Sequence, residues 1–393
     1  MSQPMSLPTM QSTKQRAGSP TRQPRPLPRF LRLLFAFATS LVFAGGAIAE
    51  TRKIIIDDDA FGLMHYMLLN APDVEVLGIT TVSGNSWANR VTAQSLRGIE
   101  NHGDTSVPVM EGATFPLLNS ERLTNRFEAL YGKLVWKGAW MREWVEPTQQ
   151  SQPPYFGPYD PVELPGGNPQ ISAAPEIAAN FLVRMVRRYP GEISIFATGP
   201  MTNLALAQRL EPRFAELAKE LIYMGGSLGP RQALDNRSAA EFAREFVNSP
   251  RREFNVFWDP EAASIVARSP WKRIVMIPVD PSTATQITSE LKARLAAVAD
   301  PRLAEEISGL EPGFPLWDEI AAGIWLKPEL IEEQKELYVD VDTHFGPGYG
   351  NTLSWAEHYQ PGLGEQKAEV ILKVDPVGLY DLMESLIGES ARR

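Results

Sequence analysis

Three adjacent aspartates, Asp57, Asp58 and Asp59, follow the β-branched run at 53–56. Such a run predicts a buried strand, and side chains two residues apart on a strand project to the same side. Asp57 and Asp59 can therefore face one point, while Asp58 faces elsewhere unless the chain has already turned. Close carboxylates repel each other unless a proton or a cation intervenes, and Ca²⁺ and Mg²⁺ bind through such oxygens. A hard divalent cation is the natural partner, and three solvated acids capping the next helix are the alternative.

Other polar residues also follow predicted strands, namely Asn85, Thr198 and Asp280. Strands that alternate with helices at this spacing predict a parallel, doubly wound sheet. In such a sheet, ligands bind in the crevice beyond the carboxyl ends of the strands. We therefore expect these residues and the aspartates to lie around one crevice.

The alternation of strands and helices runs through most of the chain. Strands are predicted at 53–56, 74–82, 107–110, 193–197, 221–224, 274–279, 337–342 and 368–374. Helices are predicted at 63–70, 88–101, 175–188, 203–209 and 260–267, with further helix up to about 328. Two stretches interrupt the pattern, an aromatic-rich one at 117–171 and a charged one at 228–252. We expect one open, mostly parallel α/β domain over residues 50–393, with two irregular inserts.

The first 49 residues differ from the rest of the chain. They contain six Lys or Arg and no acid, and they end in an apolar run at 33–48 that closes on Ala47-Ile48-Ala49. A positive region, an apolar core and a small-x-small end predict a secretory signal that is removed after Ala49. An uncleaved anchor helix is the alternative. Cleavage would take the net charge of −9 to −15 and leave a periplasmic or secreted protein without a stable membrane anchor.

Charge and cysteine content narrow the functions further. An acidic mature protein is a poor candidate for binding nucleic acids or anionic membranes, because both require Lys/Arg patches. The chain has no Cys, which excludes thiol catalysis, cysteine-based zinc sites and disulfides. A metal must therefore bind to oxygen ligands or to one of the four histidines.

The chain resembles the inosine–uridine nucleoside N-ribohydrolase family over most of its length after the leader. Six stretches carry the resemblance, in the family's order and at compatible spacing: 54–59 (IIIDDD), 78–85 (GITTVSGN), 198–205 (TGPMTNLA), 224–226 (MGG), 253–263 (EFNVFWDPEAA) and 316–318 (LWD). The resemblance implies the nucleoside hydrolase fold and hydrolysis of the N-glycosidic bond of nucleosides to ribose and free base. Family members are commonly dimers or tetramers, which leaves a homo-oligomer open.

The resemblance also implies roles for the matching residues. Asp59 corresponds to an aspartate that binds Ca²⁺ and acts as general base on water. The implied metal ligands are Asp57, Asp59, the carbonyl of Thr198, and Asp318. The residues implied to hold the ribose hydroxyls are Asn85, Glu253 and Asn255. Metal binding lowers the pKa of water, and the ribosyl group would pass through an oxocarbenium-like state.

The first motif departs from the family pattern. The family continues with Pro-Gly and a second pair of aspartates, whereas residues 60–65 here are AFGLMH. At least one family calcium ligand is therefore missing, and fewer carboxylates bind calcium more weakly. Asp58 or His65 could compensate, although imidazole suits a transition metal better than Ca²⁺. A structural role for His65 is the alternative.

A second departure is Trp317, which stands where some members have a histidine that helps protonate a purine leaving group. An indole N–H does not titrate, but the ring can stack on a base. The aromatic segment at 131–159, with Trp136, Trp140 and Tyr155, could supply a stacking wall or a lid over the base.

Two other functions remain as alternatives. One is an aspartate-nucleophile phosphatase, whose opening motif is also Asp-x-Asp after a first strand, but Phe61 stands where that motif has Thr or Val. The other is a protein that binds a nucleoside or ribosyl ligand and has lost turnover, because a fold does not fix a function.

Overall fold

The apolar run at the start of the domain forms the central strand β1 (Arg52–Asp58) of the computed structural model, which describes residues 51–143, 155–229 and 252–392. The leader and most of the second predicted insert lie outside the described residues. The remaining strands are β2 (Val74–Thr81), β3 (Val109–Glu111), β4 (Ile193–Ala197), β5 (Glu220–Met224), β6 (Ile274–Ile277), β7 (Ile331–Val341), β8 (Thr352–Trp355) and β9 (Gln366–Val374).

The described strands form one sheet in the order β3-β2-β1-β4-β5-β6-β9-β7-β8. Neighbouring strands are parallel from β3 to β9, and β7 is antiparallel to β9 and β8. The prediction of an open, mostly parallel sheet is confirmed. The order changes direction at β1 and β4, so the crevice where ligands bind in such sheets opens beside the aspartates.

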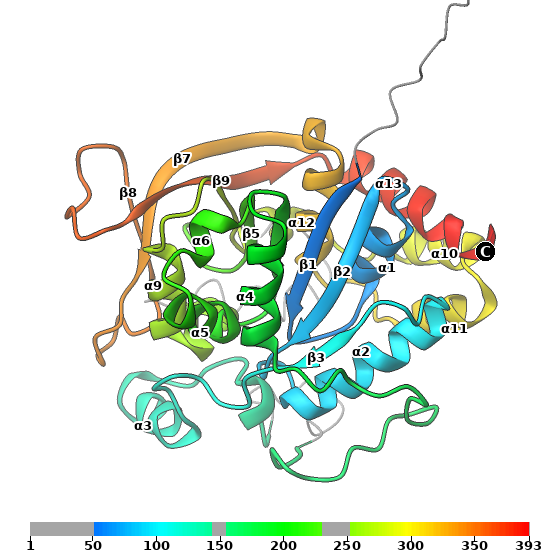
Figure 1. The fold of residues 1–393 in the computed structure, drawn as a ribbon, viewed down its shortest axis with the longest axis horizontal. Coiled ribbons are helices and arrows are strands. Elements are labelled where there is room, and N and C mark those ends of the chain that lie inside the picture. Colours follow the sequence, from blue (N-terminus) through cyan, green and yellow to red (C-terminus); the bar gives the residue numbers. More distant parts are fainter. Residues whose placement is uncertain (1–50, 144–154, 230–251, 393) are drawn as a thin grey trace, which may run out of the picture. The chain divides into compact units, whose positions relative to one another are not determined.

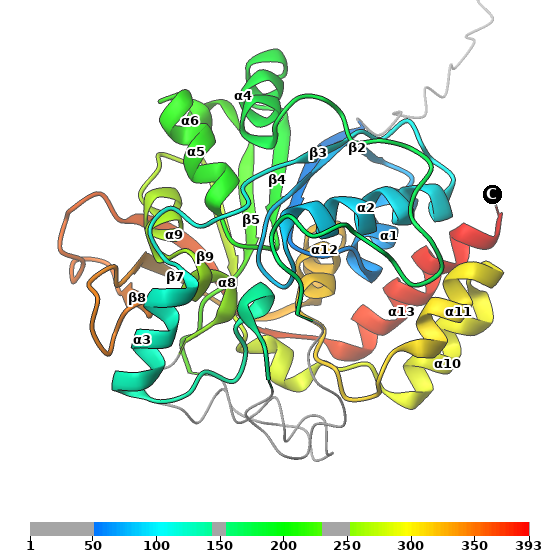
Figure 2. The same ribbon diagram turned by 90° about the horizontal axis from the view of Figure 1, so that it is seen from below.

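Helices cover both faces of this sheet (Figures 1 and 2). They are α1 (Leu63–Asn70), α2 (Ala88–His102), α3 (Glu121–Tyr131), α4 (Ala178–Arg188), α5 (Thr202–Leu210), α6 (Phe214–Leu217), α8 (Phe254–Trp258), α9 (Pro260–Ala267), α10 (Ser289–Val298), α11 (Pro301–Gly309), α12 (Asp318–Leu326) and α13 (Pro376–Gly388). Within the described chain, no helix combines the length and the apolar character needed to cross a membrane.

Two hydrophobic cores lie on opposite faces of the sheet. Ile54 and Ile56 of β1 join the core formed with α1, α2 and α10 to α13, whereas Ile55 joins the core formed with α4, α5, α6 and α9. Both faces of β1 are therefore buried, which explains why its sequence is continuously apolar rather than alternating. The two cores hold the strand rigidly and fix where its carboxyl end points.

Several helices begin with Asp-Pro, which sharpens their start. Asp259, Asp300 and Asp375 each accept a hydrogen bond from a backbone N–H of the first turn, and a proline follows each of them. An aspartate is a good N-cap, and proline at the first helical position loses no hydrogen bond. The sequence-predicted helix at 175–188 instead begins at Ala178, three residues after its proline.

Further elements also differ from the sequence prediction. The stretch at 117–171 is not wholly irregular, because it contains α3, whose start is capped by Ser120. Strand β7 begins at Ile331, six residues before the predicted strand, and β8 was not predicted at all. Residues 332–336 of β7 are exposed and mostly charged, so their composition hides a strand that pairing with β9 creates.

Asn203, at the start of α5, ties the first two strands to the loop after β3. Its Nδ2 donates to Asp57 Oδ1 (2.8 Å) and to the carbonyl of Thr81 (2.9 Å), and its Oδ1 accepts from Ala113 N (2.9 Å). Both polar atoms of the Asn203 side chain thus form hydrogen bonds within the protein, and Asn203 is 1% exposed.

Replacing Asn203 with Ala should lower the free energy of unfolding by about 2–3 kcal/mol, because buried partners lose their hydrogen bonds. Urea unfolding would measure the change. Arg209→Ala, on the exposed side of the same helix, is the control and should change stability by less than about 0.5 kcal/mol. Equal effects of the two substitutions would contradict the assigned role of Asn203.

Candidate active site

The polar residues predicted to act together lie at the carboxyl ends of parallel strands. Strand β1 ends at Asp58, β2 at Thr81, β4 at Ala197 and β5 at Met224. Because these strands run in the same direction, the segments that follow them lie at one edge of the sheet. Hydrogen bonds between these segments show which side chains meet there.

Asp59 is held by the turn that follows β2. Its Oδ2 accepts from the backbone N–H of Asn85 (2.6 Å), and its Oδ1 accepts from the side-chain Nδ2 of Asn85 (3.0 Å). Gly84 makes this approach possible, since a Cβ at that position would lie 2.0 Å from Asp59 Oδ2. Asp59 is 2% exposed, while Asn85 is exposed at the edge of the site. The structure thus brings Asp59 and Asn85 into direct contact.

Asp57 points to a different set of partners. Thr80 and Asn203 both donate to its Oδ1, and its buried Oδ2 has no hydrogen-bond partner among the described residues. Burial is the main reason that the pKa of Asp57 rises to about 7, while the hydrogen bonds from Thr80 and Asn203 act in the opposite direction. Asp57 is therefore held by the fold through only one of its two carboxylate oxygens.

Asp58 interacts directly with Asp59, although alternation along the strand predicted that it would face elsewhere. Its Oδ1 accepts from the backbone N–H of Asp59 (2.7 Å). Burial, and then the charge of Asp59, raises the pKa of Asp58 well above its usual value. The strand ends at Asp58, so the two-residue periodicity no longer applies at Asp59.

His65 packs behind Asp58. Its Nε2 lies 3.6 Å from Asp58 Oδ2, and its Nδ1 accepts from Gly62 N (3.3 Å). The ring stacks on Phe61 with centroids 4.3 Å apart. Burial lowers the pKa of His65 to about 3, so the imidazole is neutral at physiological pH. These contacts favour the structural role for His65.

Asp318 is the first residue of α12. Burial, followed by the charges of Asp58, Glu319 and Asp59, raises the pKa of Asp318 well above its usual value. Burial also raises the pKa of Asp59 and Glu319 to about 7. The carboxylates of Asp58, Asp59 and Asp318 therefore influence one another, although 259 positions separate Asp59 from Asp318 in the sequence.

Glu253 and Asn255 connect the ends of β4 and β5 to α8. Glu253 accepts from the backbone N–H groups of Gly226 (2.9 Å), Asn255 (2.8 Å) and Val256 (3.0 Å), and it is the N-cap of α8. The Nδ2 of Asn255 donates to the carbonyls of Thr198 (2.8 Å) and Met224 (3.2 Å). Both residues therefore shape the site backbone, and the charge of Glu253 also raises the pKa of Asp59.

The aromatic residues that were predicted to stack on the base lie in different environments. Trp317 is half-buried and packs against Met224 and Val279 beside the acid cluster. Trp140 is 4% exposed, and its ring is stacked on Trp258. Because that ring is covered, Trp140 is not available for the predicted stacking wall. The ring of Tyr155 instead faces the guanidinium of Arg142.

The donor set suits a hard cation in chemistry and charge. The side chains of Asp58, Asp59 and Asp318 offer only oxygen, which Ca²⁺ and Mg²⁺ prefer, and their mutual repulsion would be relieved by positive charge. Among the residues that the structure describes, however, no three His, Asp or Glu side chains are grouped closely enough to enclose a metal ion. A cation would therefore need further ligands, such as the Thr198 carbonyl.

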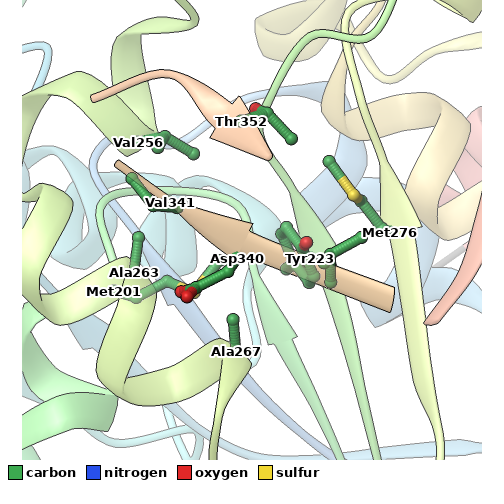
Figure 3. A pocket seen from close by; sticks show the side chains of 10 residues that line it. Met201, Tyr223, Val256, Ala263, Ala267, Met276, Asp340, Val341 and Thr352 are labelled. Atoms are coloured by element: carbon green, nitrogen blue, oxygen red, sulfur yellow. The ribbon is translucent and has the colours of Figure 1, made fainter. Parts of the chain in front are cut away.

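A small cavity lies against strands β5, β6, β7 and β8. Tyr223, Met276, Asp340 and Thr352 are among its lining residues (Figure 3). Its volume of about 10 Å³ is enough for roughly one water molecule. None of the predicted site residues lines it.

The fold is similar to the folds of solved nucleoside hydrolase structures. A plant nucleoside hydrolase matches with a TM-score of 0.63 at 21% identity, over 86% of this chain and 99% of that one. The purine-preferring ribonucleoside hydrolase from Gardnerella vaginalis matches with a TM-score of 0.61 at 20% identity, over 87% of this chain and 100% of that one. These likenesses confirm the fold class as nucleoside hydrolase-like.

Sequence relatives and a family model define the family. The chain is 28% identical over 321 residues to the pyrimidine-specific ribonucleoside hydrolase RihB of Escherichia coli, covering 77% of this chain and 87% of that protein. It is 28% identical over 368 residues to the uncharacterized protein C800.11 of Schizosaccharomyces pombe, covering 89% of each. The inosine–uridine preferring nucleoside hydrolase model matches residues 54–381. The chain therefore belongs to this family of hydrolases acting on N-glycosyl compounds.

Sequence reasoning missed the supporting groups of the site. Asn203 lay inside a recognised motif but received no role, although it bonds directly to Asp57. Thr80, on the neighbouring strand, was also unassigned. Thr80 is the second-last residue of β2, and it pairs with Asp57 of β1. Its place near the end of a predicted strand was the sequence signal for a role at the site.

The raised pKa values predict how stability changes with pH. Asp57 and Asp59 keep protons up to about pH 7 in the folded state, but lose them near pH 4 when the chain unfolds. The folded state therefore binds more protons between these values, so stability should fall as pH rises from about 4 to about 7.

Thermal unfolding in the presence of a chelator would measure this slope, and Asp59→Asn should make it shallower. Asp381→Asn, an exposed substitution on α13, is the control and should leave the slope unchanged. A melting temperature that rises with pH over this interval would contradict the assignment.

Proposed function

We propose that this protein hydrolyses the N-glycosidic bond of nucleosides to ribose and free base, and that it uses a divalent cation, with Ca²⁺ as the first candidate. The observation that carries the proposal is the buried Asp59, which both the backbone and the side chain of Asn85 hold at the carboxyl end of β1. Membership of a nucleoside hydrolase family supports the choice of bond.

In this proposal Asp59 is the general base. It takes a proton from the attacking water, as a general base within hydrogen-bond reach of that water does. Asn85 keeps the carboxylate in place by donating to both of its oxygens. The surrounding carboxylates stabilise the positive charge that develops on the ribosyl ring.

The cation would be held by Asp57, Asp59, Asp318 and the Thr198 carbonyl, with Asp58 as an additional candidate. A divalent cation supplies charge that lowers the pKa of water. The electrostatic coupling of Asp318 to Asp58 and Asp59 supports a shared site for these carboxylates. Asn85, Glu253 and Asn255 would contact the ribose hydroxyls, and Trp317 would stack on the base.

The first 49 residues are proposed to be an export signal, which would make the mature protein periplasmic or secreted. The charge and apolar pattern of this segment supports the proposal. Mass spectrometry of the protein recovered from outside the cytoplasm should give a chain that begins at Glu50.

An assay of the mature protein on a nucleoside panel tests the proposed reaction. Free base and reducing sugar should appear in the presence of Ca²⁺, and chelation should abolish their release. Asp59→Asn should lower kcat by about 100-fold or more, because general-base catalysis contributes about 10²–10⁴. Asp381→Asn, the matched control on α13, should retain full activity. Binding of nucleosides without release of base would instead support the non-catalytic ligand-binding alternative.

The stacking role of Trp317 gives a separate test. Trp317→Ala should raise KM for nucleosides about tenfold with little change in kcat, since base–aromatic stacking is worth about 1–3 kcal/mol. Trp317→Phe should restore most of the affinity. Trp355→Ala, on the edge strand β8, controls for the loss of a tryptophan and should leave KM unchanged. An unaltered KM in Trp317→Ala would rule out stacking.

A further inference from the structure

The segment at 134–141 packs directly on the turn that carries Asn85. Ala139 N donates to the carbonyl of Gly84 (2.8 Å). At Gly138 the backbone has φ of 52°, and a Cβ there would lie 2.1 Å from the same carbonyl oxygen. Only glycine permits this contact, so the approach of the two segments is built into the sequence.

Both sides of this segment are anchored. At its C-terminal side, the ring of Trp140 stacks on Trp258 with centroids 3.9 Å apart and an interplanar angle of 20°. At its N-terminal side, the buried Glu128 accepts from Leu134 N (3.0 Å) and from Lys137 Nζ (3.0 Å). These anchors flank residue 136 on either side and fix the path of its backbone.

Trp136 uses this fixed position to reach Asn85. Its Nε1 donates to Asn85 Oδ1 (2.8 Å), and Asn85 Nδ2 donates to Asp59 Oδ1 (3.0 Å). An indole N–H is only a donor, so it pairs with the oxygen end of the amide and not with the nitrogen end. The amide nitrogen is therefore directed toward Asp59.

Asn85 requires such a constraint because it is exposed. An exposed amide rotates freely in water, and a rotated amide would turn its oxygen toward the carboxylate of Asp59. Two facing oxygens repel each other, and the carboxylate would lose one of the two donors that Asn85 supplies. The hydrogen bond from Trp136 to Asn85 Oδ1 therefore limits the rotation of the Asn85 amide.

We propose that Trp136 is a positioning residue that acts on the general base Asp59 through the side chain of Asn85. This inference rests on the hydrolase function proposed above. It assigns the aromatic segment a role in orienting the site, which differs from a wall that stacks on the base. Trp136 reaches the chemistry through its N–H group, so the aromatic ring alone is not sufficient.

A double-mutant cycle tests the proposal. Trp136→Phe keeps an aromatic ring and removes the N–H, and it should lower kcat by about threefold to tenfold, the value of one neutral hydrogen bond. In an Asn85→Ala background the same substitution should change kcat by less than about twofold, because its target is gone. Effects that multiply independently in the double mutant would overturn the proposal, as would full activity of Trp136→Phe.

Trp140→Phe is the matched control in the same segment. Its ring packs on Trp258, so its replacement should lower the melting temperature, and its effect on kcat should be the same with Asn85 or Ala at position 85. A dependence on residue 85 as strong as that of Trp136→Phe would indicate general loosening of the segment and would overturn the specific role of Trp136.

An NMR measurement is independent of turnover. The indole ¹H–¹⁵N resonance that disappears in Trp136→Phe should move upfield in proton shift in Asn85→Ala, because it loses its acceptor. If the wild-type protein releases no base but this resonance moves, the proposed hydrolase function fails while the Trp136–Asn85 bond stands. If base is released and the resonance does not move, the positioning role fails and the hydrolase function stands.

Discussion

The burial of several carboxylates at one edge of the sheet is the constraint on which the rest of the site depends. Asp57, Asp58 and Asp59 are each at most 2% exposed, and removing a charged carboxylate from water is costly. The fold offsets this cost with hydrogen bonds from Thr80, Asn203 and Asn85. The negative charge that remains is met by bound protons or by a cation.

The scaffold supplies the rigidity that this arrangement needs. Strand β1 is buried on both faces by separate cores, so its carboxyl end has little freedom. Glu253 and Asn255 then fasten α8 to the ends of β4 and β5 through backbone groups. Residues that the family resemblance associates with ribose are therefore also the residues that fix the shape of the crevice.

The inserted segment between β3 and α4 completes the site from outside the sheet. Its aromatic residues have different roles, since Trp140 packs against Trp258 whereas Trp136 bonds to Asn85. Composition cannot distinguish these roles, because both residues are tryptophans in the same short stretch. The contact of Trp140 with Trp258 and that of Trp136 with Asn85 decide them.

The sequence by itself determined the parallel sheet, most element positions and the family, because apolar periodicity and short motifs are local properties. It indicated Asp59 and Asn85 for the same reason. Only the tertiary structure showed that the charges of Asp58 and Asp59 act on Asp318 and that His65 is buried against Phe61 and Asp58. It also showed that Asn203 donates to Asp57 and Trp136 to Asn85. These relations join residues from separate strands, helices and loops, and side-chain direction and burial arise only when those elements pack.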